Sequence, residues 1–307
     1  MTKKLISLLL VLVLAFSLVA CSKDEEKPAE TATETKTEEK TEEQAPEASN
    51  EPITVISRED GSGTRGAFIE ITGIEEKDGD TKVDRTTVEA VVQKSTNAVL
   101  MTVNGDKNAI GYISLGSLND SVKAVKVEGV EASADKVLDG SYKIARPFNI
   151  VYKGEADGLK KDFIDFMMSK EGQDMVLENK YVQIDTAAAE YKQNSQSGKL
   201  VVGGSTSVTP LMEKFAEKYM EMYPDVKIEI QSTGSSAGIQ AAIEGAADLG
   251  MASRDLSDEE KAELTNVVIA KDGIAVIVNN DNAVDDLSLD QIKAIFVGET
   301  KTWGDIK

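Results

Sequence analysis

The chain has 307 residues, 41% of them hydrophobic, which is enough for one large domain or two ordinary ones. Its formal net charge is −20, and this acidity argues against nucleic acid as a partner, because nucleic-acid binding depends on Lys and Arg contacts to phosphates. Exposed charges are screened beyond about 10 Å, so the acidity does not exclude a buried site for a small anion. The sequence contains no histidine, which excludes His-based acid–base catalysis, a Ser-His-Asp triad and His metal ligation.

Residues 1–20 are predicted to be a signal peptide. Lys3 and Lys4 precede an apolar run over 5–20 that is short for a membrane span and typical of a secretory signal. Cys21 is the single cysteine, so an internal disulfide is excluded. The string LVAC at 18–21 resembles the lipobox of bacterial lipoproteins, which implies cleavage before Cys21 and lipid attachment to its sulfur. An ordinary signal peptide with an incidental cysteine, or a membrane anchor, are the alternatives.

The next segment, 22–51, differs sharply in composition from the rest of the chain. It holds eleven acidic and four basic residues and no aromatic side chain. Such a segment cannot bury enough apolar surface to order itself. Together with Cys21 it is predicted to be a disordered acidic tether between membrane and domain.

The globular part is predicted to begin near Pro52, where strand-like and helix-like runs alternate in the manner of an α/β fold. Ser257 with Glu260, and Ser288 with Gln291, have the spacing of capping boxes that open further helices. The predicted strands are 53–57, 200–202, 226–230, 267–269 and 274–278, and the predicted helices include 159–169 and 210–223.

Three segments share a pattern in which a strand leads through a Gly/Ser/Thr loop into a helix. They span 56–68, 201–215 and 230–243, and the first contains Arg58. Glycine lets backbone N–H groups approach a ligand, and a helix start offers unpaired donors with partial positive charge. One such loop is more often a simple N-cap, but three of them with an arginine favour a site for a tetrahedral oxyanion. None has the Walker pattern of a nucleotide-binding P-loop.

These segments resemble the phosphate-binding proteins of phosphate ABC transporters. The resemblance rests on the strings GSTSVTPLMEKF, STGSSAGIQAAIEGAADLGMASRDL, VVIAKDGIAVIVN, LSLDQIKAIFVGETKTW, ISREDGSGTRGAF and NAIGYISLG. It implies an α/β, two-lobed fold like that of type II periplasmic binding proteins, with the ligand in the inter-lobe cleft. It also implies a non-enzymatic protein without cofactor or metal, which captures inorganic phosphate for an importer.

The resemblance assigns the phosphate ligands residue by residue. Arg58 is the cationic contact, and Asp60 is the carboxylate expected to pair with it. Ser253 stands where many members have an Asp that accepts the phosphate hydroxyl. The further binding residues are Ser62, Gly63, Thr64, Thr206, Ser207 and Ser235, and the supporting residues besides Asp60 are Ser205 and Ser236.

The order of the two halves is reversed relative to the usual family order, because the GSGTR block precedes the GSTSVTP block. The chain is therefore interpreted as circularly permuted, although a fragment of a tandem duplication or a gene-model error would give the same order. One lobe is predicted to combine 52–145 with 276–307, and the other to span 146–275. The segments 146–152 and 274–278 are expected to cross between them.

The predicted partners are inorganic phosphate, the permease subunits of an ABC transporter, and the cell membrane through the lipid on Cys21. The protein is expected to be extracytoplasmic and monomeric. Three alternatives stay open: a binder of sulfate or molybdate, a phosphohydrolase with a carboxylate-held metal, and a signalling or adhesive lipoprotein that has kept the fold without the ligand.

Overall fold

The computed structural model describes residues 50–79 and 81–306. The predicted signal peptide, Cys21 and the predicted tether up to residue 49 lie outside this part. Within the described residues, no helix has both the length and the apolar character needed to cross a membrane.

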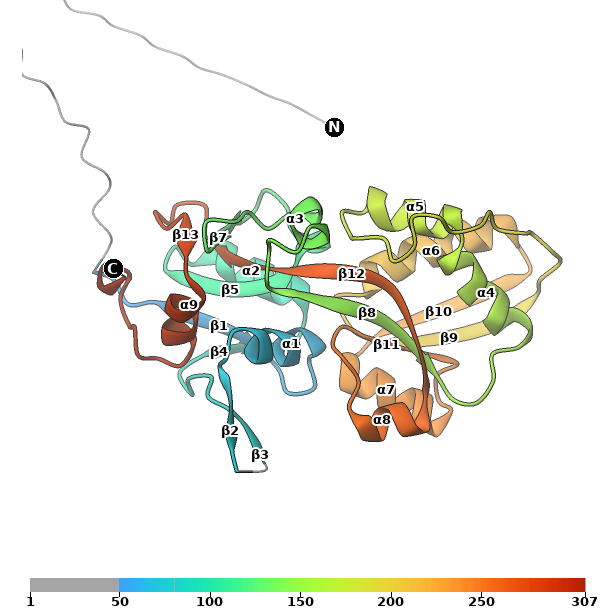
Figure 1. Cartoon of the computed structure of the whole chain (residues 1–307), viewed down its shortest axis with the longest axis horizontal. Coiled ribbons are helices and arrows are strands. Elements are labelled where there is room, and N and C mark those ends of the chain that lie inside the picture. Colours follow the sequence, from blue (N-terminus) through green and yellow to red (C-terminus); the bar gives the residue numbers. More distant parts are fainter. Residues whose placement is uncertain (1–49, 80, 307) are drawn as a thin grey trace, which may run out of the picture. The chain divides into compact units, whose positions relative to one another are not determined.

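Strands and helices are interspersed along the chain, in keeping with the α/β fold that the sequence predicts (Figure 1). The strands are β1 (Thr54–Arg58), β2 (Glu75–Asp78), β3 (Thr81–Asp84), β4 (Val91–Gln93), β5 (Ala109–Ser114), β6 (Lys123–Ala124), β7 (Lys126–Val127), β8 (Ala145–Tyr152), β9 (Gly198–Gly204), β10 (Val226–Ser232), β11 (Leu249–Ala252), β12 (Thr265–Val278) and β13 (Asp286–Leu287). The α-helices are α1 (Gly63–Ile71), α2 (Thr96–Gly105), α3 (Ala134–Leu138), α4 (Gly158–Met168), α5 (Lys170–Glu178), α6 (Thr209–Met222), α7 (Ser235–Glu244), α8 (Asp258–Glu263) and α9 (Leu289–Phe296).

The helix starts follow the predicted capping chemistry. Ser257 with Glu260, and Ser288 with Gln291, form complete capping boxes at the starts of α8 and α9. Pro210 lies in the first turn of α6, where a missing N–H costs nothing. Local sequence therefore fixes where these helices begin.

The main sheet has nine strands and runs in the order β10-β9-β11-β8-β12-β5-β1-β4, with β6 beside β12. Strand β12 pairs antiparallel with β8 through its first part and with β5 through Ile274–Val278. The sequence predicts two separate strands here, because Lys271, Asp272 and Gly273 interrupt the apolar run. In the structure they belong to one continuous strand, because Asp272 is buried against a charged partner on β8.

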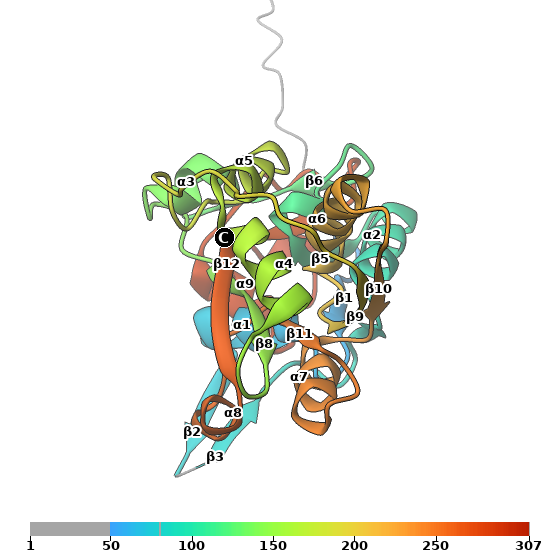
Figure 2. The same cartoon turned by 90° about the vertical axis from the view of Figure 1, so that its right-hand side faces the viewer.

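The two larger of four hydrophobic clusters lie at opposite ends of strand β12. One is built from residues between Phe148 and Ala270, and the other from residues of β1, β5, α1 and α9 with the end of β12. Figure 2 shows α6 and α7 on opposite sides of the strands around β9 and β11. The protein thus has a mixed α/β, two-lobed fold, as predicted. Val182 departs from the predicted boundaries, since it packs into the second of these cores.

The two ends of the described chain lie side by side. Pro52 forms an antiparallel bridge with Thr302, and the Ile53 N–H donates to the Lys301 carbonyl at 2.8 Å. The segment that leads into β1 therefore lies directly beside the segment around Thr302, as the permutation hypothesis requires.

Candidate anion-binding site

The predicted loops lie together at the ends of strands that belong to the two larger hydrophobic clusters. Loops after β1 and β4 lead into α1 and α2 on one side, and loops after β9 and β10 lead into α6 and α7 on the other. Short, small-residue loops place the helix starts close to the sheet, so their free N–H groups lie near its edge. Four helix N-termini thus lie around one buried region, each with its partial positive charge.

Hydroxyl groups from these loops bond to one another inside the protein. The Thr64 and Ser207 oxygens lie 2.8 Å apart, although the two residues belong to different loops. The Ser205 hydroxyl donates to the Ser253 Oγ at 2.9 Å, and the Ser235 Oγ lies 3.3 Å from the same atom. All five side chains are buried. The structure therefore brings these predicted residues together into one cluster of groups that can both donate and accept.

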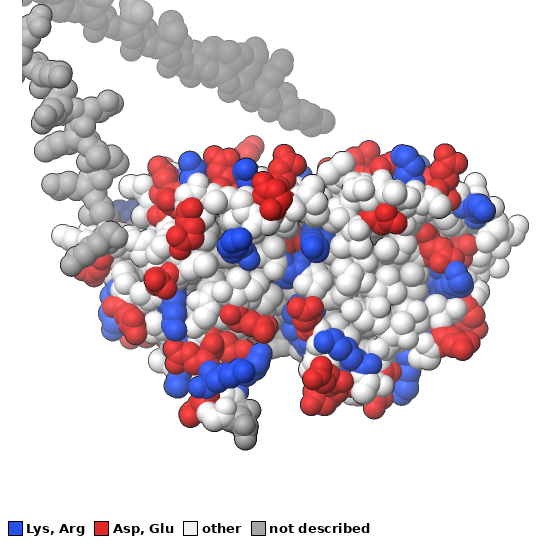
Figure 3. Space-filling view, viewed as in Figure 1, with Lys and Arg blue, Asp and Glu red and all other residues white. Residues whose placement is uncertain are grey.

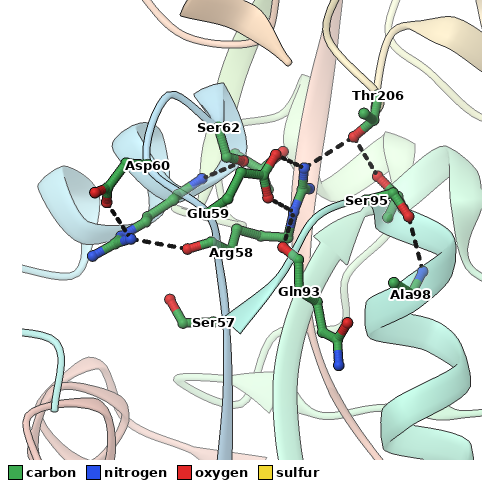
Figure 4. A network of polar contacts seen from close by, with 12 residues as sticks. Ser57, Arg58, Glu59, Asp60, Ser62, Gln93, Ser95, Ala98 and Thr206 are labelled. Carbon is green, nitrogen blue, oxygen red and sulfur yellow. Dashed lines mark hydrogen bonds and ion pairs between the residues drawn. The ribbon is translucent and has the colours of Figure 1, made fainter. Parts of the chain in front are cut away.

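Arg58 supplies the cation of this cluster and is only 2% exposed. Its Nη2 donates to the Thr206 hydroxyl at 3.0 Å, and its Nε donates to the Gln93 carbonyl at 3.2 Å (Figure 4). Nε and Nη2 also donate to the two carboxylate oxygens of Glu59, at 2.8 and 2.9 Å. The guanidinium is thus paired in the fork geometry that suits carboxylates and phosphates.

The backbone at Arg58 is held by a hydrogen bond to a buried tyrosine. Its N–H donates to the Tyr112 hydroxyl at 3.2 Å, and that hydroxyl also bonds the Ser57 side chain. Burial raises the pKa of Tyr112 to about 12, so the phenol stays neutral near pH 7.

The predicted pairing of Asp60 with Arg58 is wrong. Asp60 has a side chain that is 97% exposed, and it pairs instead with Arg65 at 2.6 Å. Glu59 takes its place, because its longer side chain reaches both Nε and Nη2 of the same guanidinium. Arg65 also bonds Asp84 and the Arg58 carbonyl, so it holds the loop from outside.

Ser62 and Gly63 directly precede Thr64 in the loop and have different roles. The Ser62 hydroxyl caps α1 by accepting from the Arg65 N–H. Gly63 packs so closely that an added Cβ would collide with the Ser235 Oγ and lie 2.8 Å from the Ser253 Oγ. Here glycine permits the close approach of the two sides.

Ser236 belongs to the rim rather than to the buried cluster. Its N–H donates to the Gly61 carbonyl at 3.0 Å, and its hydroxyl accepts from Arg254 at 3.3 Å. It therefore joins the α1 loop to the start of α7.

Thr96 is a member of the cluster that the sequence interpretation missed. Its Oγ1 lies 3.3 Å from the Ser207 Oγ and 3.4 Å from the Thr206 Oγ1, and the residue is 4% exposed. The available signal was Ser95, which caps α2 directly before an apolar run. The fourth helix start could have been read from this Ser-Thr pair.

On the face shown in Figure 3, acidic and basic side chains are intermixed. Asp255, the carboxylate nearest in sequence to Ser253, is exposed. Among residues 50–79 and 81–306, no group of three His, Cys, Asp or Glu side chains is placed to hold a metal ion.

Comparison with known proteins identifies the class. Residues 31–171 and 189–306 match the PBP superfamily domain, which covers most of the chain. The chain therefore belongs to the PBP superfamily.

Individual relatives narrow the class further. A protein named phosphate-binding protein PstS 2, from Streptococcus pneumoniae, is 50% identical over 305 residues, 99% of each chain. A protein of the same name from Streptococcus agalactiae is 51% identical over 84% of this chain and 89% of its own. A solved phosphate-binding protein of a phosphate ABC transporter from S. pneumoniae is 55% identical, with a TM-score of 0.69 over 84% of this chain and all of that one. The chain belongs to this family of phosphate-binding proteins.

The order of the sequence blocks is shared with these relatives, because one alignment runs through 99% of both chains. The GSGTR-first order is thus not peculiar to this chain, which argues against a gene-model error.

Proposed function

We propose that this protein captures inorganic phosphate outside the cytoplasm for an ABC importer. The observation that carries the proposal is the buried cluster of serine and threonine hydroxyls around Arg58, set at four helix starts. A tetrahedral oxyanion accepts hydrogen bonds on every side, and this cluster offers donors from several directions.

The charges around Arg58 favour recognition by hydrogen bonds over simple charge neutralisation. Glu59 already balances the guanidinium, and its own side chain is 22% exposed. A buried anion must therefore be stabilised by hydroxyls, backbone N–H groups and helix N-termini, because an unpaired charge is costly to bury. In this proposal Arg58, Thr64, Thr206, Ser207, Ser235 and Ser253 contact phosphate through side chains, with Ser62 and Gly63 shaping the loop.

We assign the two lobes the boundaries 52–145 plus 276–307, and 146–275. The contacts of Thr64 with Ser207 and of Arg58 with Thr206 then bridge the lobes. Entry and release of phosphate require these contacts to separate. The antiparallel pairing of β8 and β12 is the connection about which they separate.

A second oxyanion is favoured by one specific observation. Ser253 is fully buried and carries a hydroxyl where a carboxylate would repel an unprotonated anion. A hydroxyl can rotate and donate to sulfate or molybdate. We therefore expect phosphate to be preferred by a smaller margin than at a site with an Asp at this position.

Anchoring and partners complete the proposal. The lipobox string before Cys21 supports lipid attachment there, with 22–51 as tether to the membrane. Permease subunits are the partners that such a binding protein serves. In this proposal the protein acts as a monomer.

Isothermal titration of the purified protein with phosphate tests the proposal. We expect saturable binding of one phosphate per chain, and a rise in melting temperature with phosphate concentration. Absence of both effects at millimolar phosphate would contradict it. Titration with sulfate and molybdate then identifies whether another oxyanion is the ligand.

A further inference from the structure

A buried ion pair lies beside the anion site and outside the predicted ligand set. The Arg146 and Asp272 side chains are 1% and 0% exposed, and they face each other across strands β8 and β12. Nε and Nη2 of Arg146 donate to the same carboxylate oxygen, at 3.2 and 3.0 Å. The guanidinium also lies 5.4 Å from the centre of the Phe148 ring.

Other polar atoms of this pair bond to the Ser253 loop and to the end of β5. Arg146 Nη1 donates to the Ser253 carbonyl at 3.1 Å. The second oxygen of Asp272 accepts from the Ser114 hydroxyl, at the end of β5, at 3.0 Å. One arginine and one aspartate thus connect the core around β5 with the loop that carries Ser253.

Stability alone is a weak reason for such a pair. Removing two charges from water is costly, and apolar residues of similar volume often serve a core equally well or better. By contrast, the three donating nitrogens of Arg146 together fix the direction of the Ser253 peptide carbonyl, in the loop that carries a proposed ligand. A planar guanidinium does this better than an ammonium group, because its donors are held in one rigid plane.

We propose that Arg146, held by Asp272, is a positioning residue of the anion site. It fixes the orientation of the Ser253 hydroxyl by holding the Ser253 carbonyl, and it ties that orientation to strands β8 and β12. The inference rests on the proposed function of that site. It predicts that disturbing the fork lowers anion affinity and changes anion selectivity, although neither side chain is assigned a contact with the anion.

Arg146→Lys is the sharpest test, because lysine keeps the charge and can keep the contact with Asp272. It cannot also hold the Ser253 carbonyl in the same plane. We expect phosphate binding to weaken by about tenfold or more, the equivalent of one hydrogen bond involving a charged group. We also expect the ratio of phosphate to sulfate affinity to fall, because Ser253 is then no longer held as an acceptor for a protonated ligand. Arg85→Lys is the matched control, since Arg85 pairs with Glu76 at an exposed position.

A double variant, Arg146→Met with Asp272→Leu, separates positioning from folding. It removes both charges, so no unpaired charge stays buried. We expect a folded protein by circular dichroism whose phosphate affinity is as low as that of Arg146→Lys.

Each outcome decides one question. Wild-type affinity and selectivity in Arg146→Lys or in the folded double variant would overturn the positioning role and leave the proposed function standing. Equal losses of phosphate and sulfate affinity would also overturn it, because a purely structural role lowers both alike. If the wild type binds none of phosphate, sulfate and molybdate, the proposed function fails and this inference fails with it.

Discussion

The Thr64 and Ser207 hydroxyl oxygens lie 2.8 Å apart across 143 residues of sequence. Thr64 stands in the first turn of α1 and Ser207 precedes α6, so each comes from a different helix start. Because both groups are buried, an anion that separates them can accept a hydrogen bond from each hydroxyl in place of the bond they make to each other. This relationship makes Thr64 the most direct probe of the α1 side of the site.

Thr64→Val should weaken phosphate binding by about tenfold, because it removes a hydroxyl and leaves the shape nearly unchanged. Isothermal titration measures this effect. Thr72→Val is the control: the Thr72 hydroxyl is also buried but bonds only the Phe68 carbonyl at the end of the same helix. It should reduce stability by about 1 kcal/mol and leave the affinity unchanged. Equal phosphate affinities in the two variants would show that the Thr64 hydroxyl does not contact the anion.

Arg58→Ala should weaken phosphate binding by at least about tenfold, since it removes the buried cation and leaves Glu59 facing the anion. Arg58→Lys should restore only part of the loss, because lysine lacks the planar fork. Asp60→Asn is the control and should stay within about twofold of wild type, because an exposed ion pair contributes little. A larger loss in Asp60→Asn than in Arg58→Ala would reverse the assignment of the carboxylate partner.

Ser253→Asp should lower sulfate binding more than phosphate binding. A buried carboxylate accepts a hydrogen bond from protonated phosphate, whereas sulfate near neutral pH has no proton to offer. Ser253→Ala removes the hydroxyl without adding charge and should weaken both anions. Competition calorimetry at pH 7 gives both ratios. If wild type already excludes sulfate at millimolar concentration, another acceptor determines the selectivity.

The permutation hypothesis predicts one cooperative unit. Pro52 and Thr302 are bridged in space, so strand β1 joins the same fold as the end of the chain. Scanning calorimetry should show a single unfolding transition whose melting temperature rises with phosphate. At a phosphate concentration one hundred times Kd, binding should raise the free energy of unfolding by about 2.7 kcal/mol. A broad melt that ignores phosphate would indicate an incomplete lobe.

Cys21→Ala should abolish membrane anchoring, because the lipid is proposed to attach to this sulfur. The variant should appear in the soluble fraction or remain unprocessed. Fractionation with mass analysis measures both. A variant that stays in the membrane with normally cleaved mass would refute the lipobox interpretation.

Local signals in the sequence were sufficient for much of this site. Gly/Ser/Thr runs after strands predict helix starts, because capping and tight turns depend on neighbours within a few residues. Ser205, Ser207 and Ser235, which the family resemblance assigned to the site, lie in the cluster at these helix starts. The position of Asp60 was not predictable in this way, because the choice between it and adjacent Glu59 depends on how the Arg58 side chain is directed.

Long-range relationships were harder to predict. Arg146 and Asp272 face each other only through the register of β8 and β12, over 126 residues of sequence. The same buried pairing explains why β12 runs unbroken through a polar stretch that indicated a strand end. Thr96 was missed because its loop contains no glycine, the residue that marked the other three.

The central claim is that the buried hydroxyl cluster around Arg58 holds one phosphate. Equilibrium dialysis of radiolabelled phosphate against wild type, Thr64→Val and Arg58→Ala tests it most directly. The account predicts one phosphate bound per wild-type chain, weaker binding in both variants, and displacement by excess unlabelled phosphate. Binding of equal strength in all three proteins, or no bound phosphate in wild type, would contradict it.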